Sequence, residues 1–159
     1  LYNRFSTLDK RKNGYLTKEE FKSIPDLKLN PLRDRILEVL ISDFGQYDRL
    51  TFKQFVMIFS IFRRNLNREE PVNNTRENRL KFLFSLYDRD KDNKINKSEL
   101  SSILMILVGA SMPESQVMAI VDRTFAELDL IDKDISFEVF SETLKKIDID
   151  EKMSMKILK

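Results

Sequence analysis

The chain has 159 residues, of which 42% are hydrophobic and 34% charged, with a formal net charge of +2. This balance suits one compact soluble domain or two small lobes, and the charge is too small to predict nucleic-acid binding. There is no His or Cys, and there are only three Gly. This composition excludes Cys/His zinc sites, His-dependent catalytic triads, disulfides and Gly-rich phosphate loops, so we expect no enzyme. The lack of Cys fits the cytosol.

The first candidate site, residues 9–20, has the spacing of an EF-hand calcium loop. Such a loop supplies oxygen ligands from positions 1, 3, 5, 7, 9 and 12 and turns sharply at position 6. The residues that match this pattern are Asp9, Asn13, Gly14, Thr17 and Glu20. Position 3 is Arg11, which removes a ligand and brings positive charge next to the cation. We expect this loop to be structural and metal-free.

The second candidate loop, residues 43–54, departs further from the pattern. Gly45 and Tyr47 replace two ligands, and Asp48 occupies the turn. Gln54 replaces the closing Glu, so the bidentate carboxylate is missing. We expect no metal in this loop either.

The helix expected after the second loop, residues 52–62, is apolar on all sides. One stripe contains Phe52, Phe55, Val56 and Phe59, and a second contains Ile58, Ile61 and Phe62, with Met57 between them. A helix of this kind must be buried on more than one side. We interpret the second side as part of a groove for a partner helix, and tighter packing between two lobes is the alternative.

Residues 63–77 are polar, contain Pro71 and the run Asn73-Asn74-Thr75, and are predicted to form a linker. Basic residues in the first part of this segment are Arg63, Arg64 and Arg68. No aromatic residues lie between them, which favours a solvated linker over a surface for anionic lipid or nucleic acid.

The third loop, Asp88–Glu99, matches the calcium-loop pattern at every ligand position. The predicted metal ligands are Asp88, Asp90, Asp92, Lys94 through its backbone carbonyl, Asn96 and Glu99. Glu99 is the bidentate carboxylate, which favours calcium over the smaller magnesium ion. The turn position holds Asn93 in place of Gly, and Asn tolerates the left-handed conformation better than most residues. We therefore predict one Ca²⁺ site, in the third loop.

Helices are expected on both sides of this loop. Residues 78–87 place Leu80, Leu83, Phe84 and Tyr87 on one face, and the helix after the loop places Leu100, Ile103, Leu104 and Leu107 on another. Further apolar residues, Met105, Ile106, Val108 and Met112, lie beyond that core stripe. Flexible Met side chains suit a groove for a partner helix.

The fourth loop is the least regular. Counting back from Ile135 at position 8 places Leu128, Leu130 and Val139 at ligand positions 1, 3 and 12. The nearby acidic residues are Glu127, Asp129, Asp132, Asp134 and Glu138. Without a closing carboxylate we expect a metal-free partner that braces the third loop.

Paired EF-hands make a short antiparallel contact at position 8, and an apolar residue occurs there in all four loops: Leu16, Leu50, Ile95 and Ile135. We therefore predict an all-α fold of four EF-hands in two paired lobes, with short antiparallel β contacts. The expected division is an N-terminal pair (1–62), a linker (63–77), a C-terminal pair (78–146) and a tail (147–159). The tail could be frayed, cover the groove or form part of its wall.

The chain begins at Leu1 without Met, so we expect the natural N-terminus to be missing, together with any targeting or myristoylation motif. The longest apolar runs, residues 55–62 and 103–108, are far shorter than the roughly 20 residues of a membrane span.

Several stretches resemble the calcineurin B group. They are LYNRF at 1–5, STLDK at 6–10, IPDL at 24–27, NPL at 30–32, Tyr87–Asp92 and Val108-Gly109. Two features are more similar to the calcineurin B homologous proteins than to calcineurin B itself: EPVN at 70–73 before RLKF at 79–82, and IDIDEKMS at 147–154 with a basic-apolar tail.

This resemblance implies a calcium-binding cofactor of plasma-membrane Na⁺/H⁺ exchangers. Such a protein holds an amphipathic juxtamembrane helix in a groove, has silent first and second hands, and carries an N-terminal myristoyl group. It also implies a cytoplasmic location at the inner face of the plasma membrane, with peripheral membrane association. The alternative is a regulatory subunit of a calcineurin-type phosphatase, bound to its catalytic subunit. A free calcium buffer would need several working loops and no spare apolar face.

Overall fold

The computed structural model describes residues 1–45, 48–62, 75–130 and 133–145. These residues fall into two compact units, with the boundary between Leu80 and Lys81 inside helix α6. We describe each unit by itself. The predicted linker lies mostly outside the described residues and the predicted tail entirely so, and the predicted division into domains stays a prediction.

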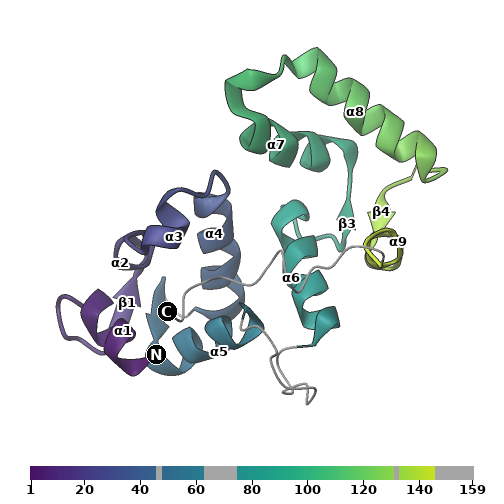
Figure 1. Cartoon of the computed structure of the whole chain (residues 1–159). Helices are drawn as coiled ribbons and strands as arrows, with labels where there is room; N and C mark the ends of the chain where they lie inside the picture. Colours follow the sequence, from purple (N-terminus) through teal and green to yellow (C-terminus); the bar gives the residue numbers. More distant parts are fainter. Residues whose placement is uncertain (46–47, 63–74, 131–132, 146–159) are drawn as a thin grey trace. The chain divides into compact units, whose positions relative to one another are not determined.

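The N-terminal unit contains two helix–loop–helix hands (Figure 1). Its elements are α1 (Tyr2–Leu8), β1 (Tyr15–Thr17), α2 (Lys18–Lys22), α3 (Pro25–Lys28), α4 (Arg33–Phe44), β2 (Arg49–Thr51) and α5 (Phe52–Phe62). The break between α2 and α3 has a local cause. Ile24 precedes Pro25 and is held extended, at φ −62° and ψ 122°, because a proline disfavours the helical conformation of the residue before it.

The core of the N-terminal unit is rich in aromatic rings that come from α1, α2 and α5. Phe5 and Phe21 both contact Phe55, with ring centroids 5.4 and 6.3 Å apart and the rings edge to face. Phe55 is completely buried, and Ile58 and Phe59 are almost so. Ile58 therefore belongs to the core stripe of α5, and its predicted place on the second stripe is wrong. Met57 is exposed, and the side chains of Ile61 and Phe62 are outside the described part.

The C-terminal unit contains the other two hands. Helix α6 (Arg76–Tyr87) leads into it, followed by β3 (Lys94–Ile95), α7 (Lys97–Val108), the 3₁₀ turn η1 (Gly109–Ser111), α8 (Glu114–Glu127), β4 (Ile135–Ser136) and α9 (Phe137–Thr143). Helix α6 starts at Arg76, two residues before the predicted start, because the Thr75 hydroxyl accepts a hydrogen bond from the Asn78 N–H at 3.2 Å and caps the first turn.

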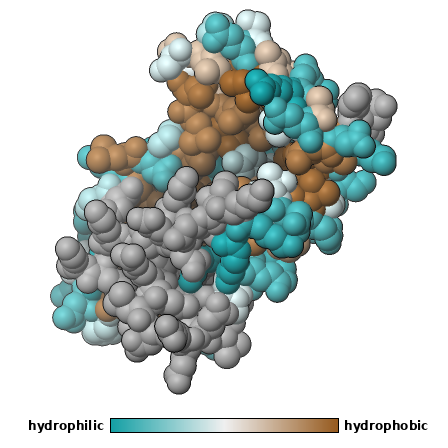
Figure 2. All heavy atoms as spheres, turned by 45° about the vertical axis from the view of Figure 1, so that its right-hand side comes forward, coloured by the Kyte–Doolittle hydropathy of each residue, from teal (hydrophilic) through white to brown (hydrophobic). Residues whose placement is uncertain are grey.

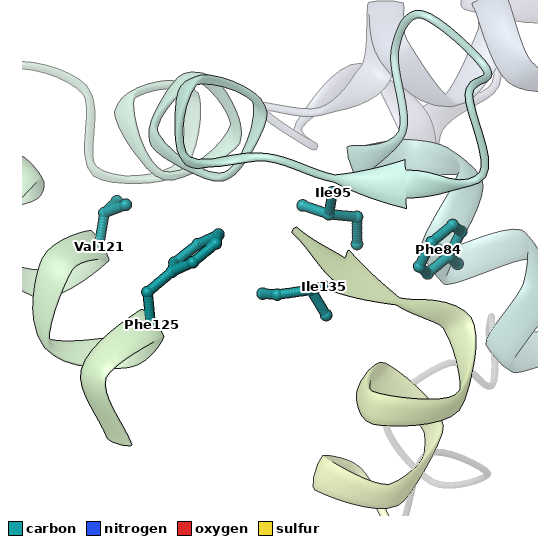
Figure 3. Packing of buried hydrophobic residues seen from close by; sticks show 5 residues of the cluster. All are labelled: Phe84, Ile95, Val121, Phe125 and Ile135. Atoms are coloured by element: carbon teal, nitrogen blue, oxygen red, sulfur yellow. The ribbon is translucent and has the colours of Figure 1, made fainter. Parts of the chain in front are cut away.

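Both pairs of hands are joined by the expected antiparallel contacts. Leu16 faces Leu50 across β1 and β2, and Ile95 faces Ile135 across β3 and β4. Figure 3 shows Ile95 and Ile135 pointing toward each other, with Phe84 of α6 on one side and Phe125 of α8 on the other. The predicted all-α fold of four paired EF-hands with short antiparallel contacts is therefore confirmed.

Among the described residues, no helix has the length and the apolar character needed to cross a membrane.

Candidate metal centre

The third loop, which we call hand 3, lies between α6 and α7. Asp88 follows the last residue of α6, and Asn93 makes the turn in the left-handed conformation with φ 65°. Helix α7 begins with a capping box, in which the Asn96 side chain accepts from the Glu99 N–H and the Glu99 carboxylate accepts from the Asn96 N–H, each at 3.0 Å. The turn that we expected Asn93 to support is therefore formed.

Three of the predicted ligands come together in hand 3. Carboxylate oxygens of Asp88, Asp90 and Glu99 lie within 4.8 Å of one another. Asp88 and Glu99 are buried and Asp90 is exposed. Such a set of hard, anionic oxygens, open to water on one side, fits a calcium ion.

The remaining predicted ligands follow the same loop. Asp92 is outside the group of three, and its Oδ1 accepts a hydrogen bond from the Lys94 N–H at 2.8 Å. The Lys94 side chain is exposed, so its charge points away from the loop, as expected. The roles of all six residues as ligands stay predictions.

The electrostatics of hand 3 also favour a cation. Burial raises the pKa of the Asp88 carboxyl above its ordinary value, and the neighbouring Glu99 and Asp92 carboxylates raise it further. Backbone hydrogen bonds from Asn93 and Lys91 act in the opposite direction. A divalent ion placed among these carboxylates would compensate for both burial and mutual repulsion.

The fourth loop, hand 4, is built from apolar contacts. Leu128, Leu130 and Val139, at ligand positions 1, 3 and 12, all pack against the hydrophobic cluster of the C-terminal unit. Their side chains offer no oxygen, which supports the prediction of a metal-free hand 4.

In the second loop, hand 2, the hydrogen bonds that cap the following helix α5 are present, but Gln54 replaces the closing carboxylate. Gln54 Oε1 accepts hydrogen bonds from the Thr51 N–H and hydroxyl, at 2.7 and 2.9 Å. Tyr47 is outside the described residues, and a metal-free hand 2 stays a prediction.

Known proteins with similar sequences have EF-hands as well. An EF-hand domain pair matches residues 77–156. The type 1 calcineurin B protein of Dictyostelium discoideum is 39% identical over 158 residues, which cover 98% of this chain and 82% of that protein. The human type 2 calcineurin B protein is 38% identical over 155 residues, covering 96% and 85%. The calcineurin B protein of Naegleria gruberi is 35% identical over 158 residues, covering 99% and 84%.

This chain belongs to the calcineurin B family. It is thus a calcium-binding EF-hand regulatory protein related to calcineurin B, and the predicted resemblance to that group is confirmed. Membership of the calcineurin B homologous subfamily stays a prediction, because these relatives are named calcineurin B subunits and not members of that subfamily.

Among solved structures, a chain of a PP2A PR70 holoenzyme has a TM-score of 0.56 at 16% sequence identity. The match covers 94% of this calcineurin B relative but only 53% of that chain, and at this identity it supports the fold alone.

Sequence reasoning missed part of the exposed apolar surface and misplaced Leu107, which was predicted on the core stripe of α7 but is 45% exposed. Met118 and Ile120 on α8 are 36% and 43% exposed, whereas Val117 and Val121 beside them are buried. Apolar residues off the buried stripe of α8 were the signal that could have located them.

Proposed function

We propose that this chain is a non-catalytic regulatory subunit that binds calcium in hand 3 and holds an amphipathic helix of a larger partner protein. The partner helix is proposed to lie against apolar side chains of α7 and α8. The observation that carries this proposal is the exposure of four large apolar residues on these two helices: Ile106 (44%), Leu107 (45%), Met118 (36%) and Ile120 (43%).

These four residues are close in the chain to the turn that joins α7 and α8. Figure 2 shows hydrophobic side chains gathered in the upper part of the view, where these helices lie in Figure 1. Exposed apolar areas of this kind mark interaction sites in soluble proteins, and an amphipathic helix in a groove is a recurrent occupant. Met118 adds a flexible side chain that adapts to the shape of a partner.

The first candidate partner is a helix of a calcineurin-type phosphatase catalytic subunit. Support comes from relatives at 35–39% identity across nearly the whole chain, each named a subunit of calcineurin. The second candidate is the juxtamembrane helix of a Na⁺/H⁺ exchanger, favoured by the resemblance of residues 70–73 and 147–154. In that case the protein would act in the cytoplasm at the inner face of the plasma membrane.

Calorimetry of the purified chain in calcium, with peptides of both helices, tests the proposal. We expect Leu107→Ser and Met118→Ser each to weaken binding of the preferred peptide by about tenfold or more, because each removes apolar contact area. Leu29→Ser is the matched control, since Leu29 is 90% exposed in the N-terminal unit. Preference for one peptide identifies the partner class. Binding of neither peptide, or equal loss in all three variants, would contradict the proposal.

A further inference from the structure

The first loop, between α1 and β1, carries a local excess of positive charge. Residues 10–18 contain four basic side chains and no acidic one: Lys10, Arg11, Lys12 and Lys18. All four are exposed. Within the described ranges, none of these four side chains forms an ion pair. Their charges are therefore available to a partner outside the chain.

The acidic residues at the two ends of this loop are turned inward. Asp9 is 6% exposed, and its carboxylate accepts hydrogen bonds from the N–H groups of Asn13 and Gly14, at 3.1 and 2.8 Å. Glu20 is 9% exposed, and its Oε2 accepts hydrogen bonds from the Thr17 N–H and hydroxyl, both at 2.9 Å. Both carboxylates are thus held by the loop itself, and the outside of the loop is basic.

The neighbouring strand β2 extends this basic surface. Arg49 of β2 is exposed, and its guanidinium carbon lies 4.5 Å from the centroid of the Tyr15 ring in β1. This cation–π contact holds the Arg49 charge beside the loop. The adjoining acidic residues are Asp48, just before Arg49, and Glu19, whose carboxylate lies 3.8 Å from the Lys22 ammonium. The basic side chains outnumber them. We call Lys10, Arg11, Lys12, Lys18 and Arg49 the basic tip.

The shape of the basic tip limits what it can bind. Lys12 and Gly14 have φ of 52° and 83°, so the chain turns sharply within the loop. Figure 1 shows this loop, between α1 and β1, at the edge of the N-terminal unit. Charges on successive exposed residues of such a turn are spread over its outside and do not line a pocket. A surface with distributed negative charge therefore suits the basic tip better than a single phosphate group does.

Among partners with distributed negative charge, an anionic membrane fits these features best. The net charge of +2 is too small for general affinity to nucleic acid. Single strands would also need exposed aromatic rings for stacking, whereas Tyr15 is half-buried and covered by Arg49. A cluster of about four to eight basic residues is enough to attract anionic lipid headgroups. The basic tip has five.

We propose that the basic tip binds the anionic surface of a membrane, such as one containing phosphatidylserine, by electrostatic attraction. Residues 10–18 expose no apolar side chain, so the loop lies against the headgroups and does not enter the hydrocarbon. Each basic residue contributes about fivefold in affinity at such a surface. The binding is weakened by salt and needs neither calcium in hand 3 nor a helix on α7 and α8.

Sedimentation of the full chain with sucrose-loaded vesicles tests the proposal. The vesicles contain either phosphatidylcholine alone or equal parts of phosphatidylcholine and phosphatidylserine. Calcium is chelated, so that no ion can link carboxylates to headgroups. We expect binding to the phosphatidylserine vesicles only. The binding should be lost at high salt, because the Debye length shrinks from about 10 Å at 0.1 M to about 3 Å at 1 M.

Paired variants test which residues carry the binding. Lys10→Gln combined with Lys12→Gln should weaken it about twentyfold, and Lys18→Gln alone about fivefold. The matched control combines Lys28→Gln with Lys133→Gln. It makes the same change in net charge at two exposed residues outside the basic tip and should change the binding by less than about twofold. Thermal unfolding should be the same in all variants, because each side chain is exposed and forms no ion pair.

Several results would overturn the proposal. Equal binding to both kinds of vesicle, or equal losses in the loop pair and the control pair, would remove the specific role of the basic tip. Loss of binding in Leu107→Ser but not in Lys10→Gln/Lys12→Gln would assign the membrane contact to the apolar surface of α7. Tighter binding to polyglutamate than to phosphatidylserine vesicles would assign the basic tip to an acidic protein segment. The calorimetric test with partner helices is independent of these outcomes.

Discussion

The Oε1 atom of Glu99, at the last position of hand 3, accepts a hydrogen bond from the N–H of Arg89, at the second position, at 2.7 Å. The same oxygen accepts a longer bond, 3.3 Å, from the Asp90 N–H. The closing carboxylate of hand 3 thus already faces the opposite side of the loop, and an ion would compete with these two backbone donors for it.

Glu99→Gln should lower calcium affinity at hand 3 by about two orders of magnitude, because the amide keeps only one of the two accepting oxygens and loses the bidentate negative ligand. Calorimetric titration measures the change. Glu114→Gln, an exposed position in the first turn of α8, is the control and should bind as the wild type does. Unchanged affinity in Glu99→Gln would show that the ligand assignment is wrong.

The calcium affinity of hand 3 should fall in mild acid, since the pKa of the Asp88 carboxyl is raised mainly by its burial. In the calcium-free protein this raised pKa stabilises the fold at low pH, and that contribution is lost as the pH rises through the folded-state pKa. The calcium affinity has the opposite pH dependence and rises with pH, because the ion must displace the Asp88 proton.

Calorimetry in two buffers of different ionisation enthalpy measures this proton release. We expect release at a pH where an ordinary, solvent-exposed aspartate has already lost its proton. An affinity that stays constant until the pH reaches the ordinary range of aspartate would contradict the raised pKa.

Ile135→Ala should destabilise the C-terminal unit by about 2–5 kcal/mol, because Ile135 is 6% exposed and packs in the cluster with Ile95 and Phe125. Denaturant unfolding of the calcium-free protein measures it. Ile120→Ala is the control: Ile120 is 43% exposed, and the change should stay within about 0.5 kcal/mol. Similar losses in the two variants would mean that the β3–β4 contact contributes little.

Gly45→Ala should destabilise the N-terminal unit by about 1–3 kcal/mol. An added Cβ would lie 2.5 Å from the Ile41 carbonyl oxygen, a backbone atom that cannot move aside without distorting the end of α4. Thermal unfolding measures the loss, with Ser6→Ala, at an exposed position of α1, as the control. A Gly45→Ala protein as stable as the control would rule out this close contact.

The sequence predicted most of what depends on local spacing. The apolar residues at position 8 predicted the facing pairs Leu16–Leu50 and Ile95–Ile135, because an EF-hand loop has a fixed length. The same count placed Leu128 at the first position of hand 4, where it is partly buried and packs against the core cluster. The tolerance of Asn for a left-handed backbone predicted the turn at Asn93.

Features that depend on contacts between distant segments could not be predicted in the same way. Arg11 predicts a metal-free first loop, and this stays a prediction; that Glu20 Oε1 in this loop is buried without a hydrogen-bond donor is visible only when the packing of the loop is known. The position of Met118 off the buried stripe of α8 can be read from the sequence, but its exposed fraction of 36% depends on how the neighbouring segments pack against α8. Both cases concern which atoms a side chain meets, rather than which element it belongs to.

Glu99 is both the predicted closing ligand of hand 3 and the third residue of α7. A movement of this carboxylate therefore changes the direction of the whole helix. The helix has 12 residues, or about 18 Å of length at 1.5 Å per residue. A tilt of about 10° at its first turn would move its far end, next to Leu107, by about 3 Å. A small adjustment of one carboxylate around an ion would thus be amplified at the apolar end of α7, where we place the partner.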